Sequence, residues 1–290
     1  MRDRGTGFAV VVAVYAPAGG VAWGAVEAVG GAPPLVVTLV ADLVATVAVF
    51  LGSLVVGNAS LYDPYWSVAP PVVALVWAGP VDAPQLALLV VMGVWAIRLT
   101  ANWAVSWRGL GHEDWRYVRL REQARVPFWL VSLVGIQLVP TLVVFAGMLP
   151  VWVALTNEEP WGLLDSVAVV VGCGAVVVEA VADRQVRRFT ADPGNRGKVL
   201  DRGLWRWSRH PNYLGEILFW FAMWLFAPAP WWTAAGPVAM VLLFVFVSVP
   251  LMDRRSLGRR PGYADYMRRT PALLPTFRFR SGRPPASRRS

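Results

Sequence analysis

Residues 33–56 read PPLVVTLVADLVATVAVFLGSLVV, an apolar run with one acid, Asp42, inside it. A helix needs about 20 such residues to cross the hydrocarbon core of a membrane. Of the 290 residues of the chain, 56% are hydrophobic and only 16% are charged. This composition predicts an all-α, multi-spanning membrane protein. We expect one domain over residues 1–277, followed by a tail, 278–290, whose Arg, Pro and Ser content is typical of disorder.

Seven further runs of the chain are also predominantly apolar. Two of them, 65–79 and 213–229, are short for a full crossing, and Pro70-Pro71 predicts a break in the first of the two. The expected fold is therefore a polytopic helical bundle with eight transmembrane helices, or with seven if one short run does not cross. The remaining runs are 8–29, 84–104, 127–152, 162–182 and 234–252.

The basic residues indicate the orientation of these spans. All 27 Lys and Arg residues fall in four groups, at residues 2–4, 98–125, 184–209 and 254–289. With eight spans, the four groups lie on one side of the membrane, and the loops on the other side carry acids. The positive-inside rule makes the basic side cytoplasmic. We therefore expect both termini and the active site to face the cytoplasm.

Several other classes of protein have little support. The net charge of +9 follows the membrane topology, so it does not indicate nucleic-acid binding. One cysteine, Cys173, allows no intrachain disulfide, and His112 and His210 stand far apart with no Cys/His cluster, so no metal site is predicted. The chain has no GxGxxG, P-loop, HExxH or GxSxG motif. No obligate protein partner is inferred, and the expected partners are a lipid-like substrate and membrane lipids.

The most informative polar stretch is GLWRWSRHPNYLGE at residues 203–216, in the turn between two apolar runs. Cationic and hydrogen-bonding groups beside aromatic rings at a membrane edge suit an anionic ligand with flat rings, such as a nucleotide. A positive-inside loop with interfacial aromatic anchors is the simpler alternative, but it does not account for Asn212 and Glu216. The candidate cofactor contacts here are Trp207, Arg209, His210, Asn212, Tyr213 and Glu216.

A second polar group lies at the end of the fourth apolar run and in the loop after it. Arg98 and Asn102 are four residues apart, so they share a helix face. The loop that follows, 105–126, holds several charged and aromatic residues, and its alternative interpretation is a solvated connection with ordinary surface ion pairs. The candidate cofactor contacts are Arg98 and Asn102 on this helix face and Arg108, Arg116 and Tyr117 in the loop.

A third polar group ends the sixth apolar run. Glu179 and Asp183 share a helix face at i, i+4. Carboxylates suit ribose or amide groups, while the arginines that follow, Arg187 among them, suit phosphate. The alternative is a pair of acids that balance nearby arginines at the end of a helix.

Acids nearer the N-terminus are candidates for chemistry. Asp42 lies within a span, where an ionisable group costs about 2.5–3.5 kcal/mol, so we expect it to face a cavity or a partner. Asp63 lies between tyrosines in NASLYDPYW, residues 58–66. A turn flanked by interfacial aromatics is the alternative for this segment. The candidate catalytic residues are Asp42, Tyr62, Asp63 and Tyr65.

Six pieces of the chain together carry a family resemblance: Asn58 with Tyr62-Asp63-Pro64-Tyr65-Trp66, Arg98 with Asn102, Glu113-Asp114 with Arg116-Tyr117, Asp183 with Gln185 and Phe189, the 203–216 segment, and Gly262-Tyr263 with Tyr266. They resemble the membrane steroid 5-alpha-reductase-like family, in its bacterial branch called DUF1295. The resemblance runs from about residue 40 to residue 277. It implies a helical bundle in the bacterial plasma membrane that holds NADPH in a pocket open to the cytoplasm. It also implies hydride transfer to an activated C=C bond of a lipid.

The resemblance also implies roles for particular residues. Its cofactor contacts correspond here to Asp183, Arg187, Trp207, Asn212, Glu216 and Tyr263, with Tyr266 in the same motif as Tyr263. Glu179 stands where the steroid enzymes have an asparagine. Those enzymes polarise the substrate carbonyl with a glutamate and a tyrosine from early spans, and this chain lacks their Gln-Glu pair. Asp42 and the Tyr62-Asp63 cluster replace that pair by position, and we expect them to act in the cytoplasmic half of the bundle. The cations between residues 184 and 202 favour NADPH over NADH.

Two other functions remain open from the sequence. Membrane isoprenylcysteine methyltransferases, which use S-adenosylmethionine, share a similar RHPxY-type segment, and their resemblance is limited to the last third of the chain. A non-catalytic lipid-binding or transport protein is the other alternative. The nucleotide bound by the purified protein would distinguish all three.

Overall fold

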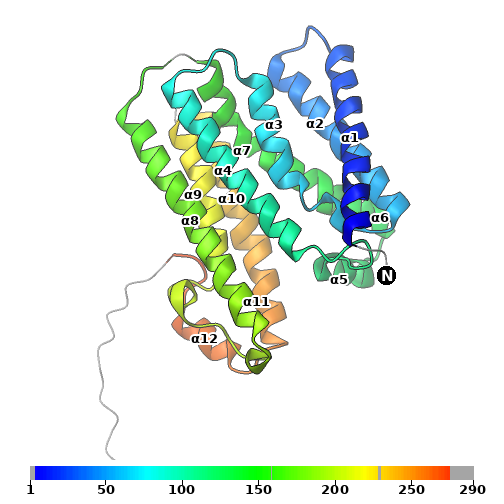
Figure 1. The fold of residues 1–290 in the computed structure, drawn as a ribbon, viewed down its shortest axis with the longest axis vertical. Coiled ribbons are helices and arrows are strands. Elements are labelled where there is room, and N and C mark those ends of the chain that lie inside the picture. The colour runs from blue at the N-terminus through cyan, green and yellow to red at the C-terminus, as the bar shows by residue number, and fades with distance from the viewer. Residues whose placement is uncertain (1–3, 158, 228–229, 275–290) are drawn as a thin grey trace, which may run out of the picture.

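The computed structural model describes residues 4–157, 159–227 and 230–274, and every regular element in this part of the chain is helical (Figure 1). The expected tail, 278–290, lies outside the described residues. The longer elements are α1 (Arg4–Ala28), α2 (Pro34–Val56), α3 (Tyr65–Trp77), α4 (Ala83–Ser106), α7 (Val139–Thr156), α8 (Leu163–Ala191), α9 (Pro211–Leu225), α10 (Ala235–Leu243) and α11 (Val249–Leu257). The shorter elements are η1 (Ala59–Tyr62), α5 (Trp115–Gln123), α6 (Phe128–Val131), η2 (Ser132–Leu138), η3 (Pro193–Asn195), η4 (Gly203–Arg206), η5 (Trp231–Ala234), η6 (Phe244–Ser248) and α12 (Tyr263–Arg269).

All the predicted apolar runs become helical, and six helical segments are long and apolar enough to cross a membrane. Two of the six are composite, because the π-helical turns η2 and η6 join shorter helices into the segments 128–156 and 231–257. The two short runs form α3 and α9, of 13 and 15 residues. At 1.5 Å per residue they are about 20–22 Å long, less than the ~30 Å thickness of the hydrocarbon core.

The break predicted at Pro70-Pro71 is wrong, because α3 continues through both prolines. Proline removes a backbone donor, and a helix in a bundle tolerates this where neighbouring groups hold the segment in place. The hydroxyl groups of Ser67 in α3 and Thr100 in α4 are 2.8 Å apart. This contact ties the proline-containing part of α3 to its neighbour.

The two ends of the bundle differ in charge. In Figure 1 the N-terminal end of α1, α5 and α12 lie toward the bottom, and the α1–α2, α3–α4 and α7–α8 connections lie at the top. The basic loops therefore gather at one end, and the connections near Asp82, Glu159 and Asp165 gather at the other. We call these the basic end and the acidic end. Their separation agrees with the charge pattern in the sequence.

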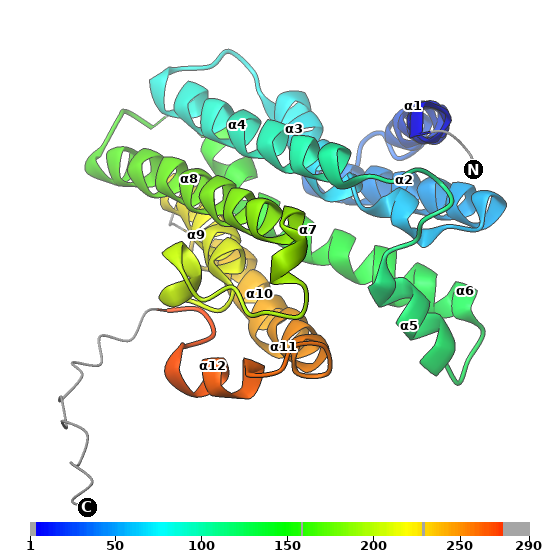
Figure 2. The ribbon, with the colours of Figure 1, turned by 60° about the horizontal axis from the view of Figure 1, so that its bottom comes forward.

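The main core lies where α4, α7, α8 and α9 meet (Figure 2). Trp95 of α4 stacks on Phe219 of α9 with ring centroids 4.3 Å apart. A Cβ atom at Gly147 of α7 would lie 2.6 Å from the Trp220 ring, so only a glycine allows α7 to pack this closely on α9. The aromatic stack fixes α4 relative to α9, and α8 packs against both helices through small apolar residues such as Ala175. These three helices carry polar side chains toward the basic end.

Candidate functional site

The first polar cluster lies between α4, α8 and α9, with Arg98 at its centre. The Arg98 guanidinium donates to Asp183 Oδ2 at 2.9 Å and to Glu179, and its Nη2 lies 4.0 Å from Glu216 Oε2. A Cβ atom at Gly215 would lie 2.4 Å from Glu179 Cγ, so this glycine lets α9 approach α8 closely. The structure therefore brings together four residues that the sequence predicted as cofactor contacts.

This Arg98 cluster contains more acid than base. Three carboxyl groups share one guanidinium. The indole N–H groups of Trp95 and Trp220 donate to Glu216 at 3.2 and 3.0 Å, but the buried Arg98 Nε and Glu179 Oε1 have no hydrogen-bond partner in the described part of the chain. Buried polar atoms are normally paired. The cluster therefore has the capacity to accept a further hydrogen-bond donor.

The second polar cluster lies at the start of α9 and is balanced. Arg209 donates to Asp253 Oδ2 at 2.8 Å and to the Thr270 carbonyl at 2.6 Å. The other carboxyl oxygen, Asp253 Oδ1, lies 3.0 Å from His210 Nε2 and accepts a hydrogen bond from Tyr263 Oη at 2.6 Å. Because these groups satisfy one another, the polar atoms of Arg209, His210 and Tyr263 hold α9, α11 and α12 together.

The end of the described chain returns to this Asp253 cluster. Tyr266 Oη donates to a backbone carbonyl of η4. The backbone N–H groups of Arg209 and His210 donate to the carbonyls of Pro271 and Ala272 at 2.9 and 3.1 Å. The segment after α12 thus clamps the loop that leads into α9, and the predicted cofactor contact Tyr266 is part of this clamp.

A pocket of 130 Å³ opens beside the clamp, between α8, α9, α11 and α12. Its volume is below the roughly 300–1,000 Å³ of pockets that enclose a whole ligand, so it has room for one ring system. Its apolar and aromatic walls include Val186, Phe189, Val199, Leu200, Trp205 and Tyr266. Asn212 and Tyr213 also line it, and within the described residues their side chains have no hydrogen-bond partner. These two predicted contacts are available to a ligand.

The remaining predicted cofactor contacts on this side lie outside the pocket. Asn102 accepts from Arg187 between α4 and α8. Trp207 is 52% exposed, with the Arg206 guanidinium carbon 5.8 Å from its ring centroid. Arg108 is exposed in the loop after α4. Arg187 and Asn102 therefore extend the Arg98 cluster toward the basic end, while Trp207 and Arg108 stand at the surface.

Arg116 and Tyr117 make their hydrogen bonds in the N-terminal half of the molecule. Tyr117 Oη donates to Asp63 Oδ1 at 2.6 Å, and Arg116 Nε donates to Asp114 Oδ1 at 2.8 Å. Asn58 donates to two carbonyls of the α4–α5 loop at 3.0 and 3.1 Å. Burial raises the pKa of Asp63 to about 6, against the opposing effect of Arg116 and of the Tyr117 hydrogen bond. This network fixes the η1 segment against α5.

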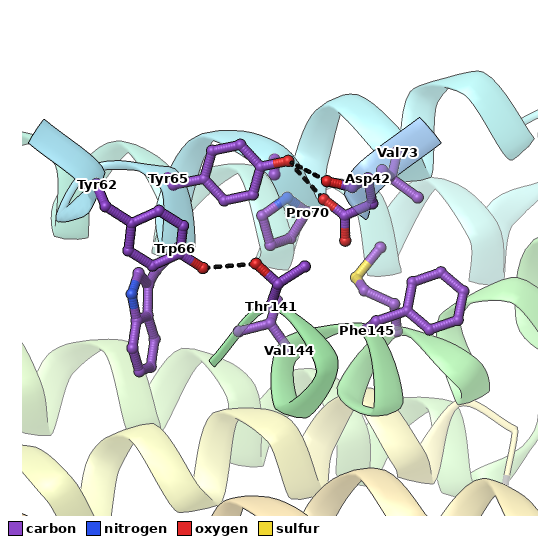
Figure 3. Close-up of a pocket in the computed structure, with 11 residues that line it drawn as sticks. Asp42, Tyr62, Tyr65, Trp66, Pro70, Val73, Thr141, Val144 and Phe145 are labelled. Carbon is purple, nitrogen blue, oxygen red and sulfur yellow. Dashed lines mark hydrogen bonds between the residues drawn. The ribbon is translucent and has the colours of Figure 1, made fainter. Parts of the chain in front are cut away.

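A second cavity lies between α2, α3 and α7 (Figure 3). Tyr65 Oη donates to Asp42 Oδ1 at 2.6 Å, and Tyr62 Oη lies 2.7 Å from Thr141 Oγ1. The cavity leaves about 10 Å³ for water-sized molecules, room for about one water. Asp42 and Tyr65 also line an apolar groove of 310 Å³ between α1, α2 and α3. The pair therefore stands between the interior cavity and the groove.

The two candidate acids occupy different positions. Asp42 is only 9% exposed and lies in the first half of the 23-residue α2, nearer the acidic end than the basic end where we expected the catalytic acid. Its second carboxyl oxygen has no hydrogen-bond partner within the described residues. Asp63 faces Tyr117 and does not line the cavity. The geometry therefore separates Asp42, Tyr62 and Tyr65 from Asp63.

Comparison with known proteins adds a family to this geometry. Residues 49–270 match the family described as "Protein of unknown function (DUF1295)". The chain belongs to the DUF1295 family. An uncharacterized protein of Schizosaccharomyces pombe is 28% identical over 211 residues, in an alignment that covers 63% of this chain and 60% of that protein. The DUF1295 match includes the Arg98 and Asp253 clusters and α12. It begins after Asp42, so the acid and α1 lie outside it.

Several residues of these clusters were not predicted from the sequence. Thr46 and Thr141 are 0% and 2% exposed, and their hydroxyl oxygens are 2.9 Å apart, which extends the Tyr62–Thr141 contact to α2. A threonine in an apolar run gives no signal, because its hydroxyl is able to bond its own helix. Asp253, in contrast, could have been identified from the sequence, because an acid at the end of an apolar run is costly unless it is paired.

Proposed function

We propose that this DUF1295 protein is an integral-membrane reductase that uses NADPH to reduce an activated C=C bond of a lipid, like the steroid 5-alpha-reductase-like enzymes that its motifs resemble. The observation that carries the proposal is the Arg98 cluster. Its surplus carboxyl groups, with Glu179 Oε1 unpaired within the described residues, suit the ribose hydroxyls and the carboxamide N–H groups of a dinucleotide.

The arrangement along α8 supports an elongated ligand. From Glu179 to Thr190, which lines the aromatic pocket, α8 rises about 16 Å at 1.5 Å per residue. One ring system thus suits the pocket beside Asn212 and Tyr213, and a second polar end suits the carboxyl groups near Arg98. NADPH has two such ends, and when bound it supplies a hydride.

The Asp42–Tyr65 pair supports the other half of the reaction. Adding hydride to a C=C bond conjugated with a carbonyl places negative charge on the carbonyl oxygen, and a donor held there stabilises the transition state more than the ground state. With one carboxyl oxygen held by Tyr65, Asp42 would present an O–H to the cavity when it is protonated. The groove between α1, α2 and α3 suits the apolar body of a lipid.

We further propose that the basic end faces the cytoplasm. The basic loops at this end follow the positive-inside pattern, and the aromatic pocket lies near them, next to α12. This orientation gives the pocket access to the soluble dinucleotide pool. The site would then take its cofactor from water and its substrate from the membrane.

The proposal is tested first by binding. Purified full-length protein in detergent is titrated with NADPH, NADH and S-adenosylmethionine in a calorimeter, and we expect saturable binding of NADPH. Binding of S-adenosylmethionine instead would support a methyltransferase, and binding of no nucleotide would support a non-catalytic lipid-binding protein. NADPH-binding protein is then assayed with enone lipids by the loss of NADPH absorbance.

A further inference from the structure

Three hydroxyl groups form a buried chain between α2, η1 and α7, beside the cavity that Asp42 lines. Thr46 Oγ1 of α2 lies 2.9 Å from Thr141 Oγ1 of α7, and Thr141 Oγ1 lies 2.7 Å from Tyr62 Oη of η1 (Figure 3). All three residues are at most 2% exposed. Hydroxyl contacts of this kind commonly hold helices together in a membrane bundle. The position of this chain at the cavity indicates a more specific role.

The two tyrosines of the cavity differ in the use of their hydroxyl protons. Tyr65 Oη donates to Asp42, at 2.6 Å from Oδ1 and 3.2 Å from the backbone carbonyl oxygen. A tyrosine hydroxyl has one proton, so the proton of Tyr65 is committed to Asp42. Within the described residues Tyr62 Oη has one hydrogen-bond partner, Thr141, and either oxygen is able to donate in that contact. Tyr62 is therefore the tyrosine whose proton can turn toward the cavity.

The direction of the hydrogen bonds along the chain decides where the Tyr62 proton points. Each hydroxyl donates once and accepts up to twice. If Tyr62 donates to Thr141, its proton is used within the chain. If Thr46 donates to Thr141 and Thr141 donates to Tyr62, both contacts are kept and the Tyr62 O–H is directed into the cavity. The chain can therefore reverse its direction without losing a contact, because the geometry fixes the donor in neither of them.

The cavity suits the oxygen to which Tyr62 would donate. Asp42, Tyr62 and Thr141 all line it, and its space of about 10 Å³ fits a group the size of one water, such as a carbonyl oxygen. Hydride addition to a C=C bond conjugated with the carbonyl moves an electron pair toward this oxygen. A Tyr62 O–H that turns to the oxygen as the charge develops stabilises the transition state more than the ground state. Donation by Thr141 to Tyr62 strengthens this bond, because hydroxyls in a chain polarise one another.

We propose that Thr46 and Thr141 are positioning residues that direct the Tyr62 O–H to the substrate carbonyl oxygen, beside the carboxyl group of Asp42. This inference rests on the proposed function. It gives the two tyrosines separate roles. Tyr65 holds Asp42, whereas Tyr62, supported by the two threonines, is the second donor to the oxygen.

The test is a double-mutant cycle on full-length protein in detergent, assayed with saturating NADPH and a panel of carbonyl-conjugated lipids that includes 4-cholesten-3-one and trans-2-hexadecenal. Thr141→Val keeps the shape of the side chain and removes its hydroxyl. We expect the turnover rate to fall about tenfold, the scale of one lost hydrogen bond, while NADPH affinity and KM stay unchanged. Thr141→Ser keeps the hydroxyl and should retain the wild-type rate. In the Tyr62→Phe background, Thr141→Val should cause no further loss, because Thr141 acts through the Tyr62 hydroxyl.

Two further variants control for folding and packing. Thr100→Val removes a hydroxyl that lies 2.8 Å from that of Ser67, in a similar pair between α3 and α4 that does not line the cavity. It should turn over the substrate like the wild type. Thr46→Val leaves the Tyr62–Thr141 contact in place and should give a smaller loss than Thr141→Val. It provides the decisive comparison if thermal melting shows that Thr141→Val does not fold.

Several results would overturn the inference. Losses that multiply when Tyr62→Phe is combined with Thr141→Val, or an equal loss in Thr100→Val, would show that the threonines only hold the helices together. Normal turnover in both Thr141→Val and Thr46→Val would remove the positioning role and leave the reductase intact. If the wild type oxidises NADPH with no lipid of the panel, the proposed function is refuted, and this inference with it.

Discussion

Arg98 and Arg209 are the centres of two polar clusters that differ in their balance of acidic and basic groups. Around Arg209, the Asp253 carboxylate is shared with His210 and Tyr263, and the partners satisfy one another. Around Arg98, three carboxyl groups share one guanidinium, and two buried atoms have no partner in the described chain. A satisfied cluster maintains the shape of the protein, whereas a cluster with surplus acceptors has capacity for a ligand. The 203–216 segment contributes to both.

The largest effect that we expect is structural. Asp253→Ala would leave the buried Arg209 without its carboxylate, and breaking a buried ion pair costs about 3–5 kcal/mol of unfolding free energy. Thermal melting of the detergent-solubilised protein measures this loss. Asp265→Ala is the control, because Asp265 pairs with Arg268 at the surface, where a pair is worth about 0–1 kcal/mol.

The Arg98 cluster should respond in the opposite way to a loss of charge. Glu179→Gln removes one of the surplus carboxylates, so its melting temperature should stay near that of the wild type. If Asp253→Ala melts normally while Glu179→Gln unfolds the protein, the two clusters have been assigned the wrong roles.

The next effect concerns turnover. Once a lipid enone that the protein reduces is found, Asp42→Asn and Tyr65→Phe should each lower the turnover rate by about 100-fold, the scale of a lost oxyanion donor, with NADPH binding retained. Asp63→Asn is the control, because Asp63 does not line the cavity. Normal turnover in the first two variants, with a large loss in Asp63→Asn, would assign the role of catalytic acid to Asp63 in the η1–α5 network.

A smaller effect concerns cofactor affinity. Asn212→Ala and Glu216→Gln should weaken NADPH binding by about 1–3 kcal/mol each, the value of a hydrogen bond lost at a buried site. Their melting temperatures should change little, which is the reverse of the result expected for Asp253→Ala. Calorimetric titration and thermal melting of the same samples compare the two. Normal binding with a collapsed melting temperature would make the segment purely structural.

The smallest effect is a pH dependence. Because burial raises the folded-state pKa of Asp63 to about 6, above the ordinary value of about 3.9, the folded protein binds this proton more tightly than the unfolded chain does. That contribution to stability is fully present below about pH 4 and is lost as the pH rises through about 6. The melting temperature of wild type minus that of Asp63→Asn should therefore fall between pH 4 and pH 7. A constant difference would contradict the raised pKa.

The helices were predictable because burial in a membrane requires long apolar runs, and α2 begins and ends within a residue of its run. Hydropathy also identified α3 and α9 as short. The continuity of α3 through Pro70 was not predictable, because it depends on packing against α4. The amphipathic elements α5 and α12 were not expected as helices, since short polar segments give a weak periodic signal.

The candidate site was predictable in its residue types and not in its pairing. Arg98, Glu179, Asp183 and Glu216 come together because each lies in the part of its apolar run that is nearest the basic end. Arg209 resembled a ligand-binding residue in the sequence, but its partner lies 44 residues away in α11. Distant pairing of this kind decides whether a charged side chain is free, and no local pattern reports it.

The clamp after α12 has a practical consequence for cloning. The family match ends at residue 270, while the carbonyls that accept from the backbone of Arg209 and His210 belong to Pro271 and Ala272. A gene cut at the family boundary would therefore encode a chain whose entry to α9 has lost both acceptors. An expression design that shortens the C-terminus should keep at least residue 272, even though the matched family region ends two residues earlier.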